Sequence, residues 1–217
     1  MSADTLSFVH RFVPGEGPAG ASTLLLLHGT GGDENDLLAL GGTLLPGAAL
    51  LSPRGNVLEN GMPRFFRRLA EGVFDIDDLQ RRTHELADFI EQASANYSLG
   101  TSRVVAVGYS NGANIAASLL LLRPQVLAAA VLFRPMVPFI PTQLPDLTAK
   151  RIFIAGGLHD SVVNPEGARR LQELLVEAGA VVRFNWHGGG HELGEDDIVA
   201  ARDCLDRWQN GTLSLAH

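Results

Sequence analysis

Residues 108–112 read Gly-Tyr-Ser-Asn-Gly, directly after an apolar run and directly before a helical pattern. A serine framed by glycines in this way is typical of a nucleophile elbow, a sharp strand-to-helix turn that exposes the hydroxyl. Side chains at positions 108 and 112 would collide across such a turn, so both positions require glycine. The helix that follows aims free N–H groups at a developing oxyanion. Ser110 is therefore predicted to attack carbonyl carbons; the alternative is a glycine-rich turn whose serine only caps the helix.

A serine hydroxyl is a weak nucleophile until a neighbouring imidazole accepts its proton. Of the seven histidines, His191 follows three consecutive glycines beyond the last predicted strand and precedes the last predicted helix. A loop of this kind can carry an imidazole back over the elbow, so we favour His191 over its rival His187. His28 ends a predicted strand, where we expect a buried structural role.

The imidazole in turn needs a carboxylate that fixes its tautomer and stabilises its charged form. Asp160 follows a predicted strand, whereas Asp146 precedes that strand and therefore lies toward the opposite edge of the sheet. The alternative role for Asp160 is that of a turn residue. The resulting chain order of serine, aspartate and histidine is the order found in α/β-hydrolases.

A tetrahedral intermediate of acyl transfer also needs two aimed hydrogen-bond donors. We expect one from the backbone N–H of Asn111, just after the nucleophile. The second is expected from Thr30, in the loop that reads His-Gly-Thr-Gly-Gly-Asp after the first buried strand. The alternative function of this loop is phosphate binding, but it lacks the lysine of a P-loop and does not match the dinucleotide fingerprint.

Short apolar runs alternate with helical periods along the chain, which predicts an α/β fold. The runs cover residues 23–27, 48–51, 103–107, 128–133, 151–155 and 181–186. Their continuous apolar character is typical of strands buried on both faces of a mostly parallel, doubly wound sheet with helices on both faces. Residues 6–14 are expected to add an antiparallel edge strand. Glycines cluster at four strand ends, the edge where such sheets bind ligands.

Composition limits the class of protein. The chain has 217 residues, of which 46% are hydrophobic and 19% charged, as expected for a single domain spanning residues 1–217. No apolar run approaches the roughly 18 residues that cross a bilayer, and the N-terminus does not resemble a signal peptide. The single cysteine, Cys204, is typical of a reducing compartment, so we expect a cytoplasmic protein without a stable membrane anchor. The net charge of −7 argues against nucleic acid as a partner.

About 25 residues separate the second predicted strand from the long helix near residue 77, too many for a simple connection. This excursion holds aromatic side chains beside Arg64, Arg67 and Arg68, which either select an anionic substrate or form a solvated face. The side chains expected to wall the pocket, with a small core under the loop as the alternative for the first four, are Met62, Phe65, Phe66, Phe74, Met136, Phe139 and Val162. The chain leaves no room for a separate lid domain, so we expect a shallow site for small or flexible esters.

Four stretches carry a resemblance to the phospholipase/carboxylesterase family of α/β-hydrolases, which includes acyl-protein thioesterases. They are LLLLHGTGGDENDLL, GYSNGANIAASLL, GLHDSVV and HGGGHEL, and the match covers nearly the whole chain. SPRGNVLENGMPRFFRRLAEGVFDIDDL and FRPMVP are more similar to small bacterial carboxylesterases, some associated with hydroquinone metabolism. The resemblance implies a triad of Ser110, Asp160 and His191, with Thr30 and Asn111 as oxyanion donors. The sequence departs from many relatives at Arg134-Pro135.

The prediction is a serine carboxylesterase that acts on a small-molecule ester through an acyl-enzyme. The alternatives are thioesterase or lysophospholipase activity at the same site, or a binding protein that keeps the fold without catalysis. Serine at the elbow disfavours an aspartate-dependent dehalogenase, and the absence of cysteine there disfavours a dienelactone hydrolase. No cofactor and no metal are expected, because the acids at 75–78 and 195–197 are explained by helix dipoles. Since many relatives are dimers, a homodimer is a further expectation.

Overall fold

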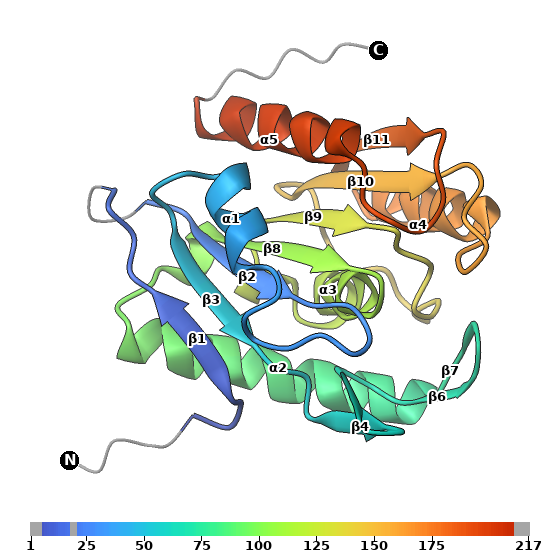
Figure 1. The fold of residues 1–217 in the computed structure, drawn as a ribbon, viewed down its shortest axis with the longest axis horizontal. Helices are drawn as coiled ribbons and strands as arrows, with labels where there is room; N and C mark the ends of the chain where they lie inside the picture. Colours follow the sequence, from blue (N-terminus) through green and yellow to red (C-terminus); the bar gives the residue numbers. More distant parts are fainter. Residues whose placement is uncertain (1–5, 18–20, 211–217) are drawn as a thin grey trace.

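The computed structural model describes residues 6–17 and 21–210; the rest of the predicted domain 1–217 lies outside the described residues. Its centre is a seven-stranded sheet in the order β1-β3-β2-β8-β9-β10-β11 (Figure 1). Only β1 runs antiparallel to its neighbour, β3. The strands are β1 (His10–Val13), β2 (Thr23–Leu27), β3 (Ala49–Pro53), β8 (Val104–Tyr109), β9 (Ala129–Phe133), β10 (Arg151–Gly157) and β11 (Val181–His187). The predicted fold class, including the antiparallel edge strand, is confirmed.

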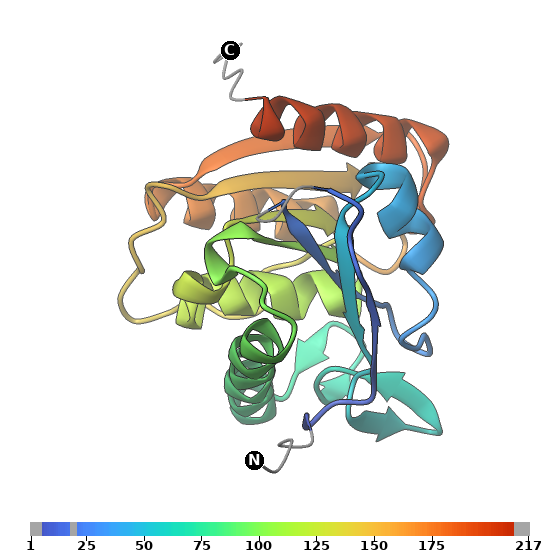
Figure 2. The same cartoon turned by 90° about the vertical axis from the view of Figure 1, so that its left-hand side faces the viewer.

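Helices cover both faces of this sheet, as Figure 2 shows from the side. They are α1 (Leu38–Leu44), α2 (Ile76–Asn96), α3 (Asn111–Leu122), α4 (Pro165–Glu177) and α5 (Glu195–Gln209), with 3-10 turns η1 (Thr101–Arg103) and η2 (Pro124–Val126). Along β2, Leu25 and Leu27 pack in the core beneath α2, α3 and α4, whereas Leu24 and Leu26 pack beneath α1 and α5. Both faces of a strand are thus buried, which explains its unbroken apolar sequence.

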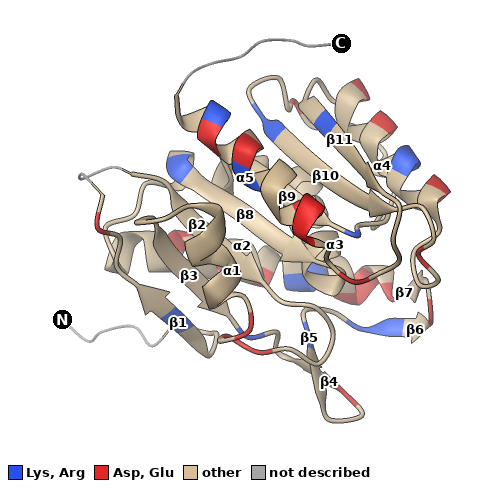
Figure 3. Ribbon diagram, turned by 45° about the horizontal axis from the view of Figure 1, so that its top comes forward, with Lys and Arg blue, Asp and Glu red and all other residues tan. Residues whose placement is uncertain are grey.

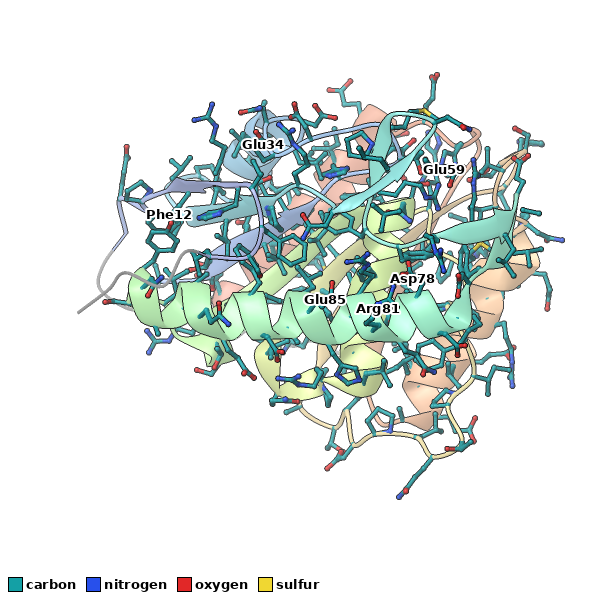
Figure 4. All side chains as sticks on the ribbon, turned by 90° about the horizontal axis from the view of Figure 1, so that it is seen from below. Phe12, Glu34, Glu59, Asp78, Arg81 and Glu85 are labelled. Carbon is teal, nitrogen blue, oxygen red and sulfur yellow. The ribbon has the colours of Figure 1, made fainter. Side chains whose placement is uncertain are left out.

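The long excursion after β3 folds into two hairpins beside the N-terminal half of α2. They consist of β4 (Val57–Glu59) with β5 (Met62–Arg64) and β6 (Arg68–Ala70) with β7 (Val73–Phe74). Figure 4 labels Glu59 on the first hairpin and Asp78 on α2. The backbone N–H of Arg67 donates to the buried carboxylate of Asp78 at 2.8 Å, which ties the excursion to the helix.

Charged residues lie mainly on the helices, hairpins and loops, whereas the central strands carry few (Figure 3). Among the residues that the structure describes, no helix is both long enough and apolar enough to span a membrane.

The strand order places a topological switch point between β2 and β8. From β2 the chain moves to β3 on one side, and after the excursion and α2 it returns to β8 on the other side. Open α/β sheets bind ligands in the crevice that such a reversal leaves at the carboxyl ends of the strands. The loop after β2 and the elbow after β8 both begin there.

Candidate active site

The turn between β8 and α3 has the strained geometry expected of an elbow. Ser110 has φ 52° and ψ −113°, and its backbone N–H donates to the carbonyl of Phe133 at 2.9 Å. A Cβ at Gly108 would lie 2.5 Å from the carbonyl oxygen of Gly112, and a Cβ at Gly112 would lie 1.9 Å from that of Leu27. Such distances leave no room for a side chain at either position, as the sequence predicted.

Three side chains from distant segments meet in one hydrogen-bonded row. His191 Nε2 lies 2.9 Å from Ser110 Oγ, and His191 Nδ1 lies 2.8 Å from Asp160 Oδ2. The other oxygen of Asp160 accepts hydrogen bonds from the backbone N–H groups of Val162 and Val163, both at 2.8 Å. Asp160 is therefore both the turn residue and the partner of the imidazole, and its carboxylate is almost fully buried.

His187 and His28, which the sequence analysis did not choose as the base, have other contacts. His187 Nδ1 accepts the backbone N–H of Gly189 at 3.0 Å, which closes the turn after β11. His28 Nε2 accepts the N–H of Gly55 at 3.0 Å, and its Nδ1 lies 2.7 Å from the carbonyl of Gly29. Burial lowers the pKa of His28, because the charged ring would lose its hydration. His28 has the buried structural role that its position at the end of a strand predicted.

Thr30 and Asn111 both line the cavity that contains Ser110 and His191. Within the described chain, neither backbone N–H donates to another backbone group outside its own element. The excursion holds both residues: Arg64 Nη1 donates to Thr30 Oγ1 at 2.6 Å, and the N–H of Phe65 donates to Asn111 Oδ1 at 2.8 Å. The excursion therefore fixes the side chains of both residues at the cavity that contains Ser110.

The cavity at the serine has a volume of about 310 Å³. Some of the predicted pocket residues line it and others do not. Met136 and Val162 line it. Phe65 and Phe66 do not, because they are 2% and 0% exposed and belong to the core.

Met62 and Phe139, which were also predicted for the pocket, lie away from the cavity wall. Met62 is 41% exposed and faces Gly31, and Phe139 packs against the core. Phe74, the other aromatic residue predicted from the excursion, does line the cavity, and so do Tyr109 and Asn114, which were not predicted. Tyr109 and Asn114 could have been found from the sequence, since Tyr109 precedes the nucleophile and Asn114 lies one helical turn after it.

The three arginines of the excursion have different environments. Arg64 is only 3% exposed and lines the cavity, where Glu59 lies 3.3 Å from its guanidinium. Arg68 also lines the cavity and pairs with the same Glu59 at 2.8 Å. Arg67 points outward and pairs with Asp75 at 2.6 Å. The solvated face that the sequence suggested therefore describes Arg67 and not Arg64.

Comparison with known proteins places this chain among hydrolases. The family model described as "Dienelactone hydrolase family" matches residues 66–198, a stretch that contains Ser110, Asp160 and His191. The absence of cysteine at the elbow, taken from the sequence as an argument against dienelactone hydrolases, therefore does not separate the chain from that family. The residue at the elbow of this chain is nevertheless serine and not cysteine.

Individual relatives agree with the family match. "Putative hydrolase MhqD" of Bacillus subtilis (strain 168) is 50% identical over 182 residues, covering 84% of this chain and 91% of the relative. The Bacillus cereus carboxylesterase structure superposes with a TM-score of 0.90 at 47% identity, covering 93% of this chain and 94% of that one. A carboxylesterase from Mesorhizobium loti superposes with a TM-score of 0.85 at 31% identity, covering 94% and 96%. Bacterial carboxylesterases were the relatives that the sequence resemblance indicated.

Proposed function

The chain belongs to the dienelactone hydrolase family, and we propose that it is a serine carboxylesterase with Ser110 as nucleophile. The observation that carries this proposal is the row of hydrogen bonds from Ser110 through His191 to Asp160 at the wall of an open cavity. Serine, imidazole and carboxylate in this order can activate a hydroxyl for attack on a carbonyl carbon.

The reaction proceeds in two half-reactions. His191 Nε2 takes the proton of Ser110 as its Oγ bonds to the ester carbonyl carbon, and the Thr30 and Asn111 amides donate to the resulting oxyanion. The intermediate collapses, the C–O bond to the alcohol breaks, and His191 gives its proton to the departing oxygen. Water then attacks the acyl-serine with the same histidine as base, releasing the carboxylic acid and free Ser110. Asp160 holds the imidazole tautomer throughout.

The cavity suggests the size of the substrate. A volume of about 310 Å³ lies at the lower end of ligand pockets, which range over roughly 300–1,000 Å³. Esters with short acyl groups are therefore proposed as substrates. A series of nitrophenyl esters of increasing acyl length, compared by kcat/KM, tests this; values that still rise beyond acyl chains of about eight carbons would contradict it.

Removal of the nucleophile tests the reaction itself. Ser110→Ala is expected to lower kcat for nitrophenyl butyrate by several powers of ten and to abolish labelling by a fluorophosphonate probe. Ser102→Ala is the matched control, since Ser102 is an exposed serine in η1, outside the cavity that contains Ser110. Retention of wild-type esterase activity by Ser110→Ala would refute the proposal. A binding protein without catalysis would neither hydrolyse the ester nor take the label.

A further inference from the structure

Arg134 directly follows β9 and is completely buried, although arginine is rarely found without solvent contact. Its backbone has φ 54°, a conformation that residues with a Cβ seldom adopt. Its N–H donates to the carbonyl of Ala155 at 2.8 Å, and the preceding residue, Phe133, accepts the N–H of Ser110. Arg134 therefore starts from the backbone segment that also holds the elbow.

The Arg134 guanidinium points into the loop that carries His191. Its Nε donates to the carbonyl of Gly190 at 2.9 Å, and its Nη2 donates to the carbonyl of Glu192 at 2.7 Å. The carbonyl between them, that of His191 itself, accepts the hydroxyl of Tyr109 at 3.1 Å. Side chains from the ends of β8 and β9 thus hold consecutive carbonyls on both sides of the proposed base.

The charge of Arg134 is matched by Asp197, which is also fully buried. The pair is bidentate, with Nη2 to Oδ2 at 2.6 Å and Nη1 to Oδ1 at 3.2 Å. Asp197 Oδ2 also accepts the N–H of Gly194 at 3.0 Å, at the far end of the same loop. The acid that the sequence assigned only to the dipole of α5 is therefore part of a buried network.

A loop that begins with Gly188, Gly189 and Gly190 has little conformational preference of its own. Without external contacts it would sample many positions, and His191 would lie within reach of Ser110 in only some of them. Reaction rates depend strongly on this placement, since a shift of about 1 Å can cost about 10²-fold. The contacts of Arg134 supply the order that the loop sequence lacks.

We infer that Arg134, paired with Asp197, is a positioning residue that holds the His191 loop in its reactive geometry; this inference rests on the proposed function. The planar guanidinium can donate to two carbonyls and a carboxylate at once, which a lysine ammonium cannot do with the same geometry. Neither residue lines the cavity with Ser110, so neither side chain is placed to contact a substrate there.

Arg134→Lys keeps the buried charge and tests the geometry. We expect kcat to fall about 10²-fold with an unchanged KM, and labelling by a fluorophosphonate to slow in parallel. The low-field proton resonance of the His191–Asp160 hydrogen bond should broaden or disappear. Asp197→Asn, which is nearly isosteric, should lower kcat in the same direction and decides the question if Arg134→Lys does not fold.

Leu205→Ala serves as the matched control, because Leu205 is a buried core residue on the same helix as Asp197. It should lower the melting temperature but leave kcat and the low-field resonance unchanged at temperatures where the protein is folded. Wild-type kcat and resonance in folded Arg134→Lys would overturn the inference, as would equal losses of kcat in Leu205→Ala. If Ser110→Ala is inactive while Arg134→Lys is fully active, only the positioning role fails. If Ser110→Ala stays active, the proposed function fails.

Discussion

Replacing Gly112 by alanine tests whether the elbow depends on the absence of a Cβ. The added atom would lie 1.9 Å from the carbonyl oxygen of Leu27, 2.4 Å from its carbon and 2.6 Å from the oxygen of His28. The first distance is roughly 1.5 Å shorter than ordinary van der Waals contact allows. All three atoms belong to the backbone, so no side chain can rotate away. The clash is relieved only if α3 and β2 move apart.

Such a movement changes both stability and activity. Overpacking against fixed backbone belongs to the severe class of substitutions, so we expect the free energy of unfolding to fall by about 4–5 kcal/mol. For a chain of this length that corresponds to a melting temperature lower by roughly 8–20 °C. Because Ser110 begins the displaced helix, a shift of about 1 Å away from His191 should also lower kcat/KM by about 10²-fold.

The measurements are thermal unfolding followed by circular dichroism and the hydrolysis of nitrophenyl butyrate. Gly42→Ala is the matched control, because Gly42 lies exposed in α1 with no atom within 4 Å of its added Cβ. That variant should be more stable by about 0.5–1 kcal/mol and fully active. A Gly112→Ala protein with the melting temperature and kcat/KM of the wild type would refute the reasoning.

Three further outcomes follow from side-chain environments. Asp160→Asn should lower kcat by about 10⁴-fold while the protein stays folded, because the imidazole loses the acceptor for Nδ1; full activity would exclude Asp160 as the acid. Burial lowers the pKa of His28, so its contribution to stability is complete above about pH 6.5 and is lost as the pH falls toward the lowered value. Urea unfolding of wild type and His28→Asn between about pH 5 and pH 7 measures this, and identical slopes with pH would contradict it. Burial raises the pKa of Cys204 to about 11, so iodoacetamide at about pH 8 should modify it only after unfolding, as mass spectrometry can show; rapid labelling of the folded protein would contradict this.

Sequence patterns predicted the framework well where the cause of a structure is local. Strands buried on both faces must be apolar throughout, so the sequence predicts their positions. β2 has the predicted bounds, and β3, β8, β9, β10 and β11 differ by at most two residues at an end. The edge strand β1 begins four residues after the start of the predicted stretch 6–14. The glycines around Ser110 mark a close backbone approach that no other residue type allows. His191 and Asp160 followed from chain order and from the requirement that each lie at a strand's carboxyl end.

The packing of the excursion was harder to predict from the sequence, because it is set by segments that are distant in the chain. Phe65 and Phe66 are adjacent, so in an exposed hairpin one of them would face solvent. Both are buried because the segment is covered on one side by the ring of His28, 4.7 Å from that of Phe65, and on the other by Phe74, 5.0 Å from Phe66. No local pattern shows that double cover, so the sequence could not decide whether these aromatic residues line the pocket or form a core under the loop.

The buried pair of Arg134 and Asp197 was not predictable for a related reason. An acid in the first turn of a helix already has a sufficient local explanation in the helix dipole. Its actual partner lies 63 positions away in the chain. Without knowledge of that pair, the sequence shows only that Arg134 differs from the residue that many relatives have at this position. The structure shows that its side chain is turned away from the cavity and into the base loop.

Ser110 and Arg134 are two non-glycine residues with positive φ, one just after β8 and the other just after its neighbour β9. Strained backbone persists only where surrounding contacts enforce it, and such residues concentrate at functional sites. Here the two strained residues direct their side chains to the same loop from different sides: Ser110 Oγ toward the ring of His191, and Arg134 toward the carbonyls beside it. One contact is suited to proton transfer and the other to holding the proton acceptor in place. The sheet therefore contributes to the proposed chemistry twice, once through the nucleophile and once through the support of its base.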